Sequence, residues 1–197
     1  MMLRSFIAVE IPVEIQSAIA QSIAPLIKTL PKPLIRWVAP QNVHLTLKFL
    51  GDVSPANLER VAQAIKVEAA SHEIFSMSVG GLGAFPTHGR ARVIWIGLEA
   101  PPALASVQRG VDAVAAKLGY PTEERPFSPH LTIGRVAQNA SAPDSQRIHA
   151  ALEATKVGIL GTVRVQAVHI FKSDLQPGGS VYTLLYSLSM KIKEEPA

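Results

Sequence analysis

Two short motifs in this sequence carry residues that can do acid–base chemistry. The first is His44-Leu45-Thr46, the second is His130-Leu131-Thr132, and Arg135 follows the second. Side chains two positions apart share one face of a β-strand, so each histidine is expected beside its threonine, with the leucine on the other face. Imidazoles titrate near neutral pH, so a pair of them can supply one general base and one general acid.

Cleavage of a phosphoester fits this set of groups. A base takes the proton from the attacking water, and an acid protonates the leaving oxygen. The hydroxyls of Thr46 and Thr132 can hold the non-bridging oxygens, and the planar guanidinium of Arg135 is a good phosphate ligand. Strict alternation would point Arg135 away from His130, so we predict that this strand ends or bulges at Gly134.

Lys48 falls on the same predicted face as His44 and Thr46, opposite Leu47 and Phe49. It would either add positive charge to the site or reach into solvent as a surface lysine.

Two other interpretations of the histidines stay open. Each could be a structural histidine, although two copies of the motif make this less persuasive than a single copy would. A two-histidine zinc site would need a third ligand, and no carboxylate lies near either motif in the sequence. The chain has no cysteine, which excludes thiolate metal sites and cysteine nucleophiles. We expect no metal and no cofactor.

Composition predicts a packed globular protein. Of 197 residues, 48% are hydrophobic and 17% charged, and the net charge of +4 permits an anionic partner such as RNA. The apolar start of the chain is broken at Glu10, Pro12 and Glu14, which argues against a signal peptide. We expect a cytoplasmic monomer that does not associate with membranes.

The apolar periodicity predicts alternating strands and helices. Strands are expected at 3–9, 36–38, 44–50, 74–83, 91–98, 130–136, 162–172 and 181–190, and helices at 12–29, 54–70, 101–119 and 144–157. The two histidine motifs each begin a similar series of elements, which indicates an internal repeat. The predicted fold class is α+β, with two lobes related by a pseudo-twofold axis. Each lobe has a mainly antiparallel sheet with helices packed outside, and the active-site cleft lies between the lobes.

We expect one domain over residues 1–197. Its repeat would cover about 44–118 and 130–190, completed by residues 1–30.

With these motifs the chain resembles the two-histidine (2H) phosphoesterase superfamily. Within it, the sequence is most similar to the bacterial and archaeal RNA 2′,3′-cyclic phosphodiesterases, also called 2′-5′ RNA ligases. The resemblance extends over nearly the whole chain. It rests on the segments Arg4-Ser-Phe-Ile-Ala, Arg36-Trp-Val, His44-Leu-Thr-Leu-Lys-Phe-Leu-Gly, Phe85-Pro86, Arg92-Val-Ile-Trp95, Phe127-Ser-Pro-His-Leu-Thr-Ile-Gly-Arg135, Ser173-Asp-Leu-Gln-Pro-Gly178 and Tyr182.

The resemblance implies metal-independent hydrolysis of an RNA terminal 2′,3′-cyclic phosphate to a 2′-phosphomonoester. By analogy, His44 is the general acid and His130 the general base, while Thr46, Thr132 and Arg135 bind the phosphate. The implied partners are RNAs with cyclic-phosphate ends, tRNA fragments among them. Reaction with an RNA 5′-hydroxyl in place of water would give 2′-5′ ligation.

Other functions remain open at this point. The substrate could be a small cyclic nucleotide or a 2′-5′ oligoadenylate, or the protein could bind RNA ends without turnover. Arg36, Arg90, Arg92 and Arg125 flank the motifs and are candidate contacts for RNA phosphates. Trp37 and Phe127 precede the motifs and would either stack on a base or pack in the core.

Overall fold

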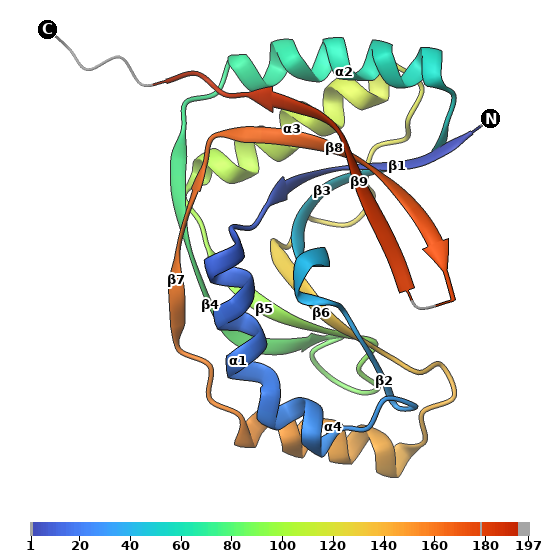
Figure 1. Cartoon of the computed structure of the whole chain (residues 1–197), viewed down its shortest axis with the longest axis vertical. Coiled ribbons are helices and arrows are strands. Elements are labelled where there is room, and N and C mark those ends of the chain that lie inside the picture. Colours follow the sequence, from blue (N-terminus) through green and yellow to red (C-terminus); the bar gives the residue numbers. More distant parts are fainter. Residues whose placement is uncertain (1, 178, 193–197) are drawn as a thin grey trace, which may run out of the picture.

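Two antiparallel sheets and four α-helices make up the fold (Figure 1). The computed structural model describes residues 2–177 and 179–192. Along the chain the elements are β1 (Leu3–Glu10), α1 (Val13–Thr29), β2 (Ile35–Trp37), the 3-10 helix η1 (Pro40–Asn42), β3 (His44–Val53), α2 (Pro55–Ala70), β4 (Phe75–Phe85), β5 (Val93–Glu99), α3 (Pro102–Lys117), β6 (His130–Val136), α4 (Ala142–Ala154), β7 (Ile159–Val165), β8 (Ala167–Gln176) and β9 (Gly179–Ser189).

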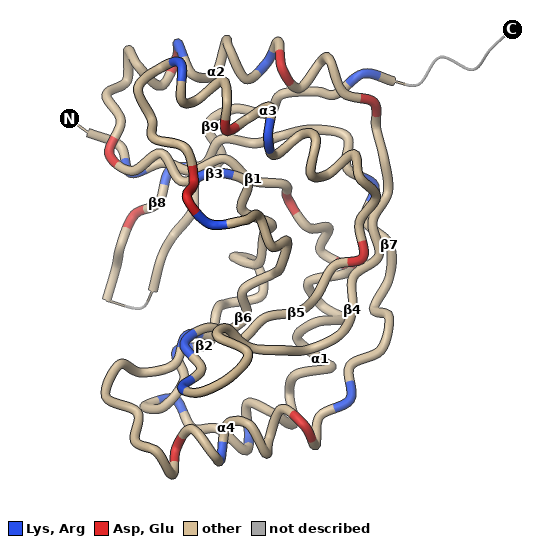
Figure 2. Tube along the Cα trace, turned by 180° about the vertical axis from the view of Figure 1, so that it is seen from behind, with Lys and Arg blue, Asp and Glu red and all other residues tan. Residues whose placement is uncertain are grey.

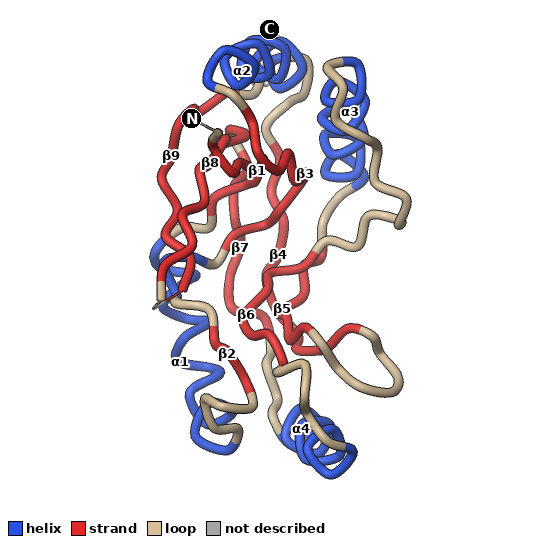
Figure 3. The backbone as a smooth tube through the Cα atoms, turned by 90° about the vertical axis from the view of Figure 1, so that its right-hand side faces the viewer, coloured by secondary structure: helices blue, strands red, loops and turns tan. Residues whose placement is uncertain are grey.

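Each sheet forms the centre of one lobe. The four-stranded sheet has the order β3-β1-β8-β9 and lies with α2 and α3, whereas the five-stranded sheet has the order β2-β6-β5-β4-β7 and lies with α1 and α4 (Figures 1 and 3). The two-lobed α+β fold expected from the sequence is therefore confirmed.

The lobes are interlocked by two helices that cross between them. In sequence, α1 follows β1 of the four-stranded sheet and precedes β2 of the five-stranded sheet, and it packs on β7 and α4 of this second lobe. In the opposite direction, α3 connects β5 to β6 of the five-stranded sheet but packs on α2 and β3 of the first lobe. Strands β3 and β6, which begin with the two histidines, contact each other across the lobes.

The helices form where amphipathic patterns and end signals coincide. The buried face of α1 carries Ile15, Ile19, Ile23 and Leu26, spaced three or four residues apart as one helix face requires. At the start of α2, the hydroxyl of Ser54 accepts a hydrogen bond from the backbone N–H of Asn57 at 3.3 Å, a typical N-cap.

One predicted element is wrong. The sequence predicted a single strand over 162–172, but this stretch belongs to two strands in different sheets, β7 and β8. Strand β7 buries Val163 and Val165, and β8 buries Val168 and Ile170. The phase of the alternation therefore changes between the two strands, which is what allows the chain to pass from one sheet to the other.

No helix among the described residues is long and apolar enough to cross a membrane. The repeat over 44–118 and 130–190, within one domain of 1–197, stays a prediction.

Candidate active site

Both histidine-bearing strands contain a β-bulge just after the threonine. In the pairing of β3 with β1, Thr46 lies opposite Ala8 and Lys48 lies opposite Ile7, so Leu47 is the extra residue. In the pairing of β6 with β5, Thr132 lies opposite Trp95 and Gly134 opposite Ile94, so Ile133 is the extra residue. A bulge reverses the alternation of all residues after it, which decides what faces the site.

In β6 the bulge returns Arg135 to the face of His130 and Thr132. The predicted bulge is present, with Ile133 as the extra residue, and Arg135 is exposed. Gly134 instead faces the packed side, where a Cβ atom would lie only 2.9 Å from Cγ2 of Ile35. A residue with no side chain is therefore needed at the point where the alternation reverses.

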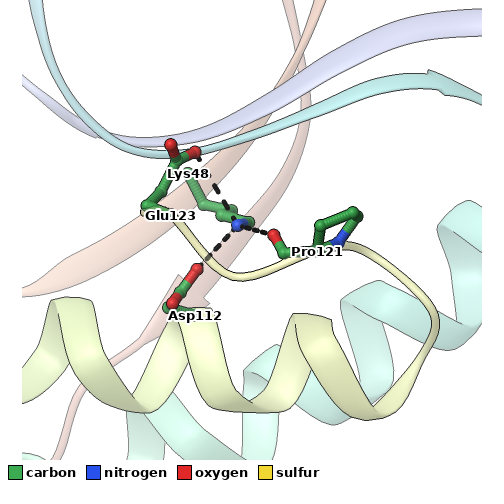
Figure 4. Close-up of polar contacts among 4 residues, drawn as sticks. All are labelled: Lys48, Asp112, Pro121 and Glu123. Carbon is green, nitrogen blue, oxygen red and sulfur yellow. Dashed lines mark hydrogen bonds and ion pairs between the residues drawn. The ribbon is translucent and has the colours of Figure 1, made fainter. Parts of the chain in front are cut away.

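In β3 the same bulge places Lys48 differently from our prediction. Lys48 does not share the face of His44; it is only 2% exposed, and its ammonium forms an ion pair with Asp112 of α3 at 2.6 Å (Figure 4). It also donates a hydrogen bond to the backbone carbonyl of Pro121 and lies 3.7 Å from Glu123. Phe49, predicted to pack inside, is 59% exposed for the same reason.

The two histidines make the same hydrogen bond. Nδ1 of His44 lies 2.8 Å from the carbonyl oxygen of Asn42, and Nδ1 of His130 lies 2.7 Å from the carbonyl oxygen of Ser128, in each case two residues back. A carbonyl can only accept, so Nδ1 carries the proton in both rings. This leaves Nε2 of each imidazole with a lone pair that can take a proton or, once protonated, give one.

Aromatic rings hold both imidazoles in place. The rings of Phe6 and Tyr182 lie 4.7 Å and 5.1 Å from that of His44, and Tyr182 meets it edge-on at 88°. The ring of Phe85 meets His130 in the same edge-on way, at 5.0 Å and 85°. These three rings come from β1, β9 and β4, and we had assigned none of them a role from the sequence.

A pocket of about 570 Å³ opens beside His44. Its walls include Phe6 and Tyr182, together with Phe171 and Leu184 of the β8–β9 hairpin. Trp37 and Phe127, for which stacking on a base and packing in the core were both open, do not line it; both are half-buried and pack against the hydrophobic core. The indole N–H of Trp37 donates to the carbonyl of Leu30 at 3.4 Å.

The predicted site residues are brought together only in part. Arg135 lines a second pocket and lies close enough to His44 to affect its ionisation. His130, Thr46 and Thr132 line neither pocket. Their positions follow from the register of β3 and β6, in which each histidine shares one strand face with the threonine two residues later. Within the described part of the chain, neither threonine hydroxyl makes a side-chain hydrogen bond to the protein, and no three carboxylate or imidazole groups gather as metal ligands would.

Burial lowers the pKa of the His44 imidazole, and the nearby positive charge of Arg135 lowers it further. The hydrogen bond to Asn42 acts in the opposite direction but does not cancel the effect of burial. His44 is therefore neutral in the free protein at neutral pH, with its Nε2 lone pair available.

This lowered pKa predicts a pH-dependent stability. Unfolding releases His44 to its usual pKa of about 6.5. Below that pH the unfolded chain binds a proton that the folded chain does not, so the free energy of unfolding falls as pH decreases from about 6.5 towards the lowered pKa. Urea unfolding between pH 7.5 and 5.5 should show a smaller loss for His44→Gln than for the parent.

His88→Gln provides the control, because this imidazole is exposed. His169 is also held at a lowered pKa by burial, so the His44→Gln variant should retain part of the pH dependence. An unchanged pH dependence in His44→Gln would contradict the assignment.

Comparison with known proteins places this chain among the phosphoesterases. The pattern of the family described as LigT-like phosphoesterase matches residues 9–95 and again 96–182. An RNA 2′,3′-cyclic phosphodiesterase of Methanothermobacter thermautotrophicus is 35% identical over 149 residues, which are 76% of this chain and 79% of the relative. The two lobes and the paired histidine motifs thus define a two-histidine phosphoesterase.

Solved structures agree with this class. The crystal structure of a protein from Thermus thermophilus superposes with a TM-score of 0.79 and 27% identity, covering 98% of this chain and 100% of the other. Escherichia coli LigT complexed with 3′-AMP superposes with a TM-score of 0.72 and 25% identity, covering 96% and 99%. The chain belongs to the LigT-like phosphoesterase family.

Proposed function

We propose that this protein hydrolyses the 2′,3′-cyclic phosphate at the end of an RNA to a 2′-phosphomonoester, with no metal in the reaction. The main support for this proposal is that the two imidazoles make the same hydrogen bond and are left with the same free nitrogen. Each is fixed through Nδ1 to a carbonyl two residues back, and each keeps Nε2 for proton transfer. The relative from Methanothermobacter thermautotrophicus bears the name of this activity.

In the proposed reaction, water attacks the phosphorus atom and the bond from phosphorus to O3′ breaks. Nε2 of His130 takes the proton of the water, and protonated Nε2 of His44 gives its proton to the departing O3′. The product keeps the phosphate on O2′, and the two imidazoles have exchanged protonation states, so exchange with solvent resets them.

His44 can act as the general acid only after it gains a proton, and we expect it to gain that proton when the substrate binds. Burial and Arg135 keep the pKa of His44 low in the free protein, so this imidazole is neutral there. An anionic phosphate bound next to Nε2 raises the pKa of an imidazole, because it stabilises the charged form. Binding of the cyclic phosphate would therefore load His44 with the proton that the leaving oxygen requires.

The remaining groups would hold the substrate. Arg135 and the hydroxyls of Thr46 and Thr132 would bind the non-bridging oxygens, where negative charge increases in the transition state. The apolar wall of Phe6 and Tyr182 would accept the terminal nucleobase, since aromatic side chains stack on any base.

The test uses a short RNA that ends in a 2′,3′-cyclic phosphate, incubated with the protein in EDTA. We expect a 2′-phosphate product, identified by ³¹P NMR against synthetic standards. A 3′-phosphate product would mean that O2′ leaves, and the acid and base roles would have to be exchanged. Absence of product in EDTA together with activity on added divalent metal would overturn the metal-free mechanism, and absence of product under both conditions would overturn the proposal.

The same site also suggests 2′-5′ ligation. An RNA 5′-hydroxyl in place of water would attack the phosphorus, and the products would be joined by a 2′-5′ phosphodiester. Adding an RNA with a 5′-hydroxyl to the same incubation would reveal this product on a gel. Cyclic-phosphate ends of RNA, including tRNA fragments, are the proposed partners of a protein that we propose to be monomeric and cytoplasmic.

A further inference from the structure

A second pocket, of about 460 Å³, lies in the lobe of the five-stranded sheet. Its lining residues include four cations from three segments of the chain, namely Lys32 just before β2 and Arg36 within it, Arg92 before β5 and Arg135 in β6. No carboxylate among the described residues lines this pocket. Lys and Arg positions gather around β2 in Figure 2.

The cations are close together without neutralising partners. Arg36 lies directly opposite Arg135 in the pairing of β2 with β6. Like charges that face each other across two strands destabilise a sheet. None of the four makes an ion pair within the described part of the chain. An arrangement of this kind is stabilised when an anion binds between the charges.

Arg135 belongs both to this pocket and to β6, the strand that begins with His130. This arginine lines the pocket, and its charge also reaches His44. One cyclic phosphate carries a single negative charge, which Arg135 alone can balance. The other three cations therefore exceed what the reacting group requires, whereas an RNA strand brings one further charge with every nucleotide.

We propose that Lys32, Arg36 and Arg92 bind the RNA phosphodiester backbone on the 5′ side of the reacting nucleotide. This inference rests on the proposed function and adds a direction for the RNA strand. The terminal cyclic phosphate lies at the histidines, and the preceding phosphates follow the surface of the five-stranded lobe past β2. The protein thereby distinguishes an RNA end from a free cyclic mononucleotide, which has no such phosphate.

Besides its proposed contact with RNA, Arg92 has a structural role. Its Nη1 donates to the carbonyl of Gln138 at 3.1 Å, which fixes the turn after β6. Lys32 and Arg36 are exposed and make no side-chain hydrogen bond or ion pair in the described residues. Lys32→Gln/Arg36→Gln is therefore the variant that removes charge from the pocket with the least disturbance of the fold.

The experiment measures kcat/KM on a 2′,3′-cyclic mononucleotide and on a dinucleotide and trinucleotide with the same end. In the parent, kcat/KM should rise once an internal phosphate is present. In Lys32→Gln/Arg36→Gln, the ratio of the trinucleotide value to the mononucleotide value should fall about tenfold or more. The slope of log kcat/KM against log salt concentration should become shallower by about 0.7 for each phosphate that the variant no longer binds.

The matched control is Lys66→Gln/Arg109→Gln, which removes the same two charges from exposed positions on α2 and α3. It should keep the parent's ratio and salt slope. A pocket variant whose ratio falls no more than that of this control would overturn the inference while the proposed function stands.

A binding measurement separates this inference from the proposed function. Fluorescence anisotropy of a labelled RNA trinucleotide with a 2′-phosphate end does not depend on turnover. If the parent hydrolyses none of the substrates, the proposed function fails, and the pocket is judged by this measurement alone. Weaker binding by the pocket variant than by the control would support the backbone site, and equal binding would overturn it.

Discussion

His44→Ala and His130→Ala should each lower kcat/KM on an RNA 2′,3′-cyclic phosphate by about 10²–10⁴-fold, the usual loss when one acid–base group is removed. Each variant removes an imidazole that the fold holds through Nδ1 with Nε2 free. The parent should show a bell-shaped dependence of kcat/KM on pH, with limbs that belong to the coupled pair of histidines. The rate measured by product release from a short RNA checks both expectations.

A thio-substituted substrate separates the two histidines by role. Replacing O3′ of the cyclic phosphate by sulfur gives a thiolate leaving group, which departs without a proton because thiols are far more acidic than alcohols. His44→Ala should recover most of its lost rate on this substrate, whereas His130→Ala should not. Recovery of the His130→Ala variant instead would show that His130 is the acid.

Two controls keep these results interpretable. His88→Ala removes an exposed imidazole and should retain the parent's rate. Thermal unfolding of each variant shows whether the fold survives, since His44 contacts the rings of Phe6 and Tyr182. A folded His44→Ala or His130→Ala protein with less than a tenfold loss of rate would contradict the proposed mechanism.

Much of the fold could be predicted because its elements carry strong local signals. The apolar periodicity of α1 and the His-X-Thr alternation are readable residue by residue. Even the bulge in β6 was predictable, because it resolves a conflict between Arg135 as a phosphate ligand and the alternation that would turn it away. The internal repeat predicted two lobes, and the resemblance to a known family added the roles of the residues.

The equivalent bulge in β3 was missed, although the repeat contained a signal for it. Buried apolar residues occur at Leu45, Leu47 and Leu50, so their spacing changes from two to three at the bulge. Had the bulge predicted for the second motif been applied to the first, Lys48 would have been placed inside and Phe49 outside. The split of 162–172 into β7 and β8 has a similar cause, a change of phase within a run of valines.

The surroundings of the histidines could not be predicted from local sequence. Phe6 and Tyr182 are 176 residues apart in the chain and meet at His44 only because β1 and β9 lie in one sheet with β3. Pairing of strands so distant in sequence depends on the whole fold, and local propensity carries no information about it.

Lys48→Met should lower the free energy of unfolding by about 3–5 kcal/mol, the usual cost of leaving one partner of a buried ion pair alone. Lys48 is 2% exposed and Asp112 is 16% exposed, so water can replace the lost ammonium only poorly. The variant also leaves the carbonyl of Pro121 without its donor. Chemical denaturation of the parent and the variant at neutral pH measures the difference.

The chain offers a matched control in Lys172→Met. Lys172 pairs with Asp174 at 2.9 Å, but the two side chains are 29% and 42% exposed, so this change should cost only about 0–1 kcal/mol. The double variant Lys48→Met/Asp112→Leu removes both charges of the pair and should recover much of the lost stability. Replacing both partners of a buried ion pair by apolar residues often changes the free energy of unfolding only a little. Equal effects of Lys48→Met and Lys172→Met would show that the buried pair does not stabilise the fold.

Lys48 also connects the two histidine motifs. It lies in β3 four residues after His44, and it holds Pro121 and Glu123 of the segment that leads from α3 to His130. Removal of the lysine should therefore speed cleavage after Glu123 and Glu124 by a glutamate-specific protease under native conditions, because this segment loses its anchor to β3. In the Lys48→Met/Asp112→Leu protein, much of the global stability should return but the hydrogen bond to Pro121 does not. Cleavage there should thus remain faster than in the parent, and cleavage at the parent's rate would mean that other interactions hold the segment.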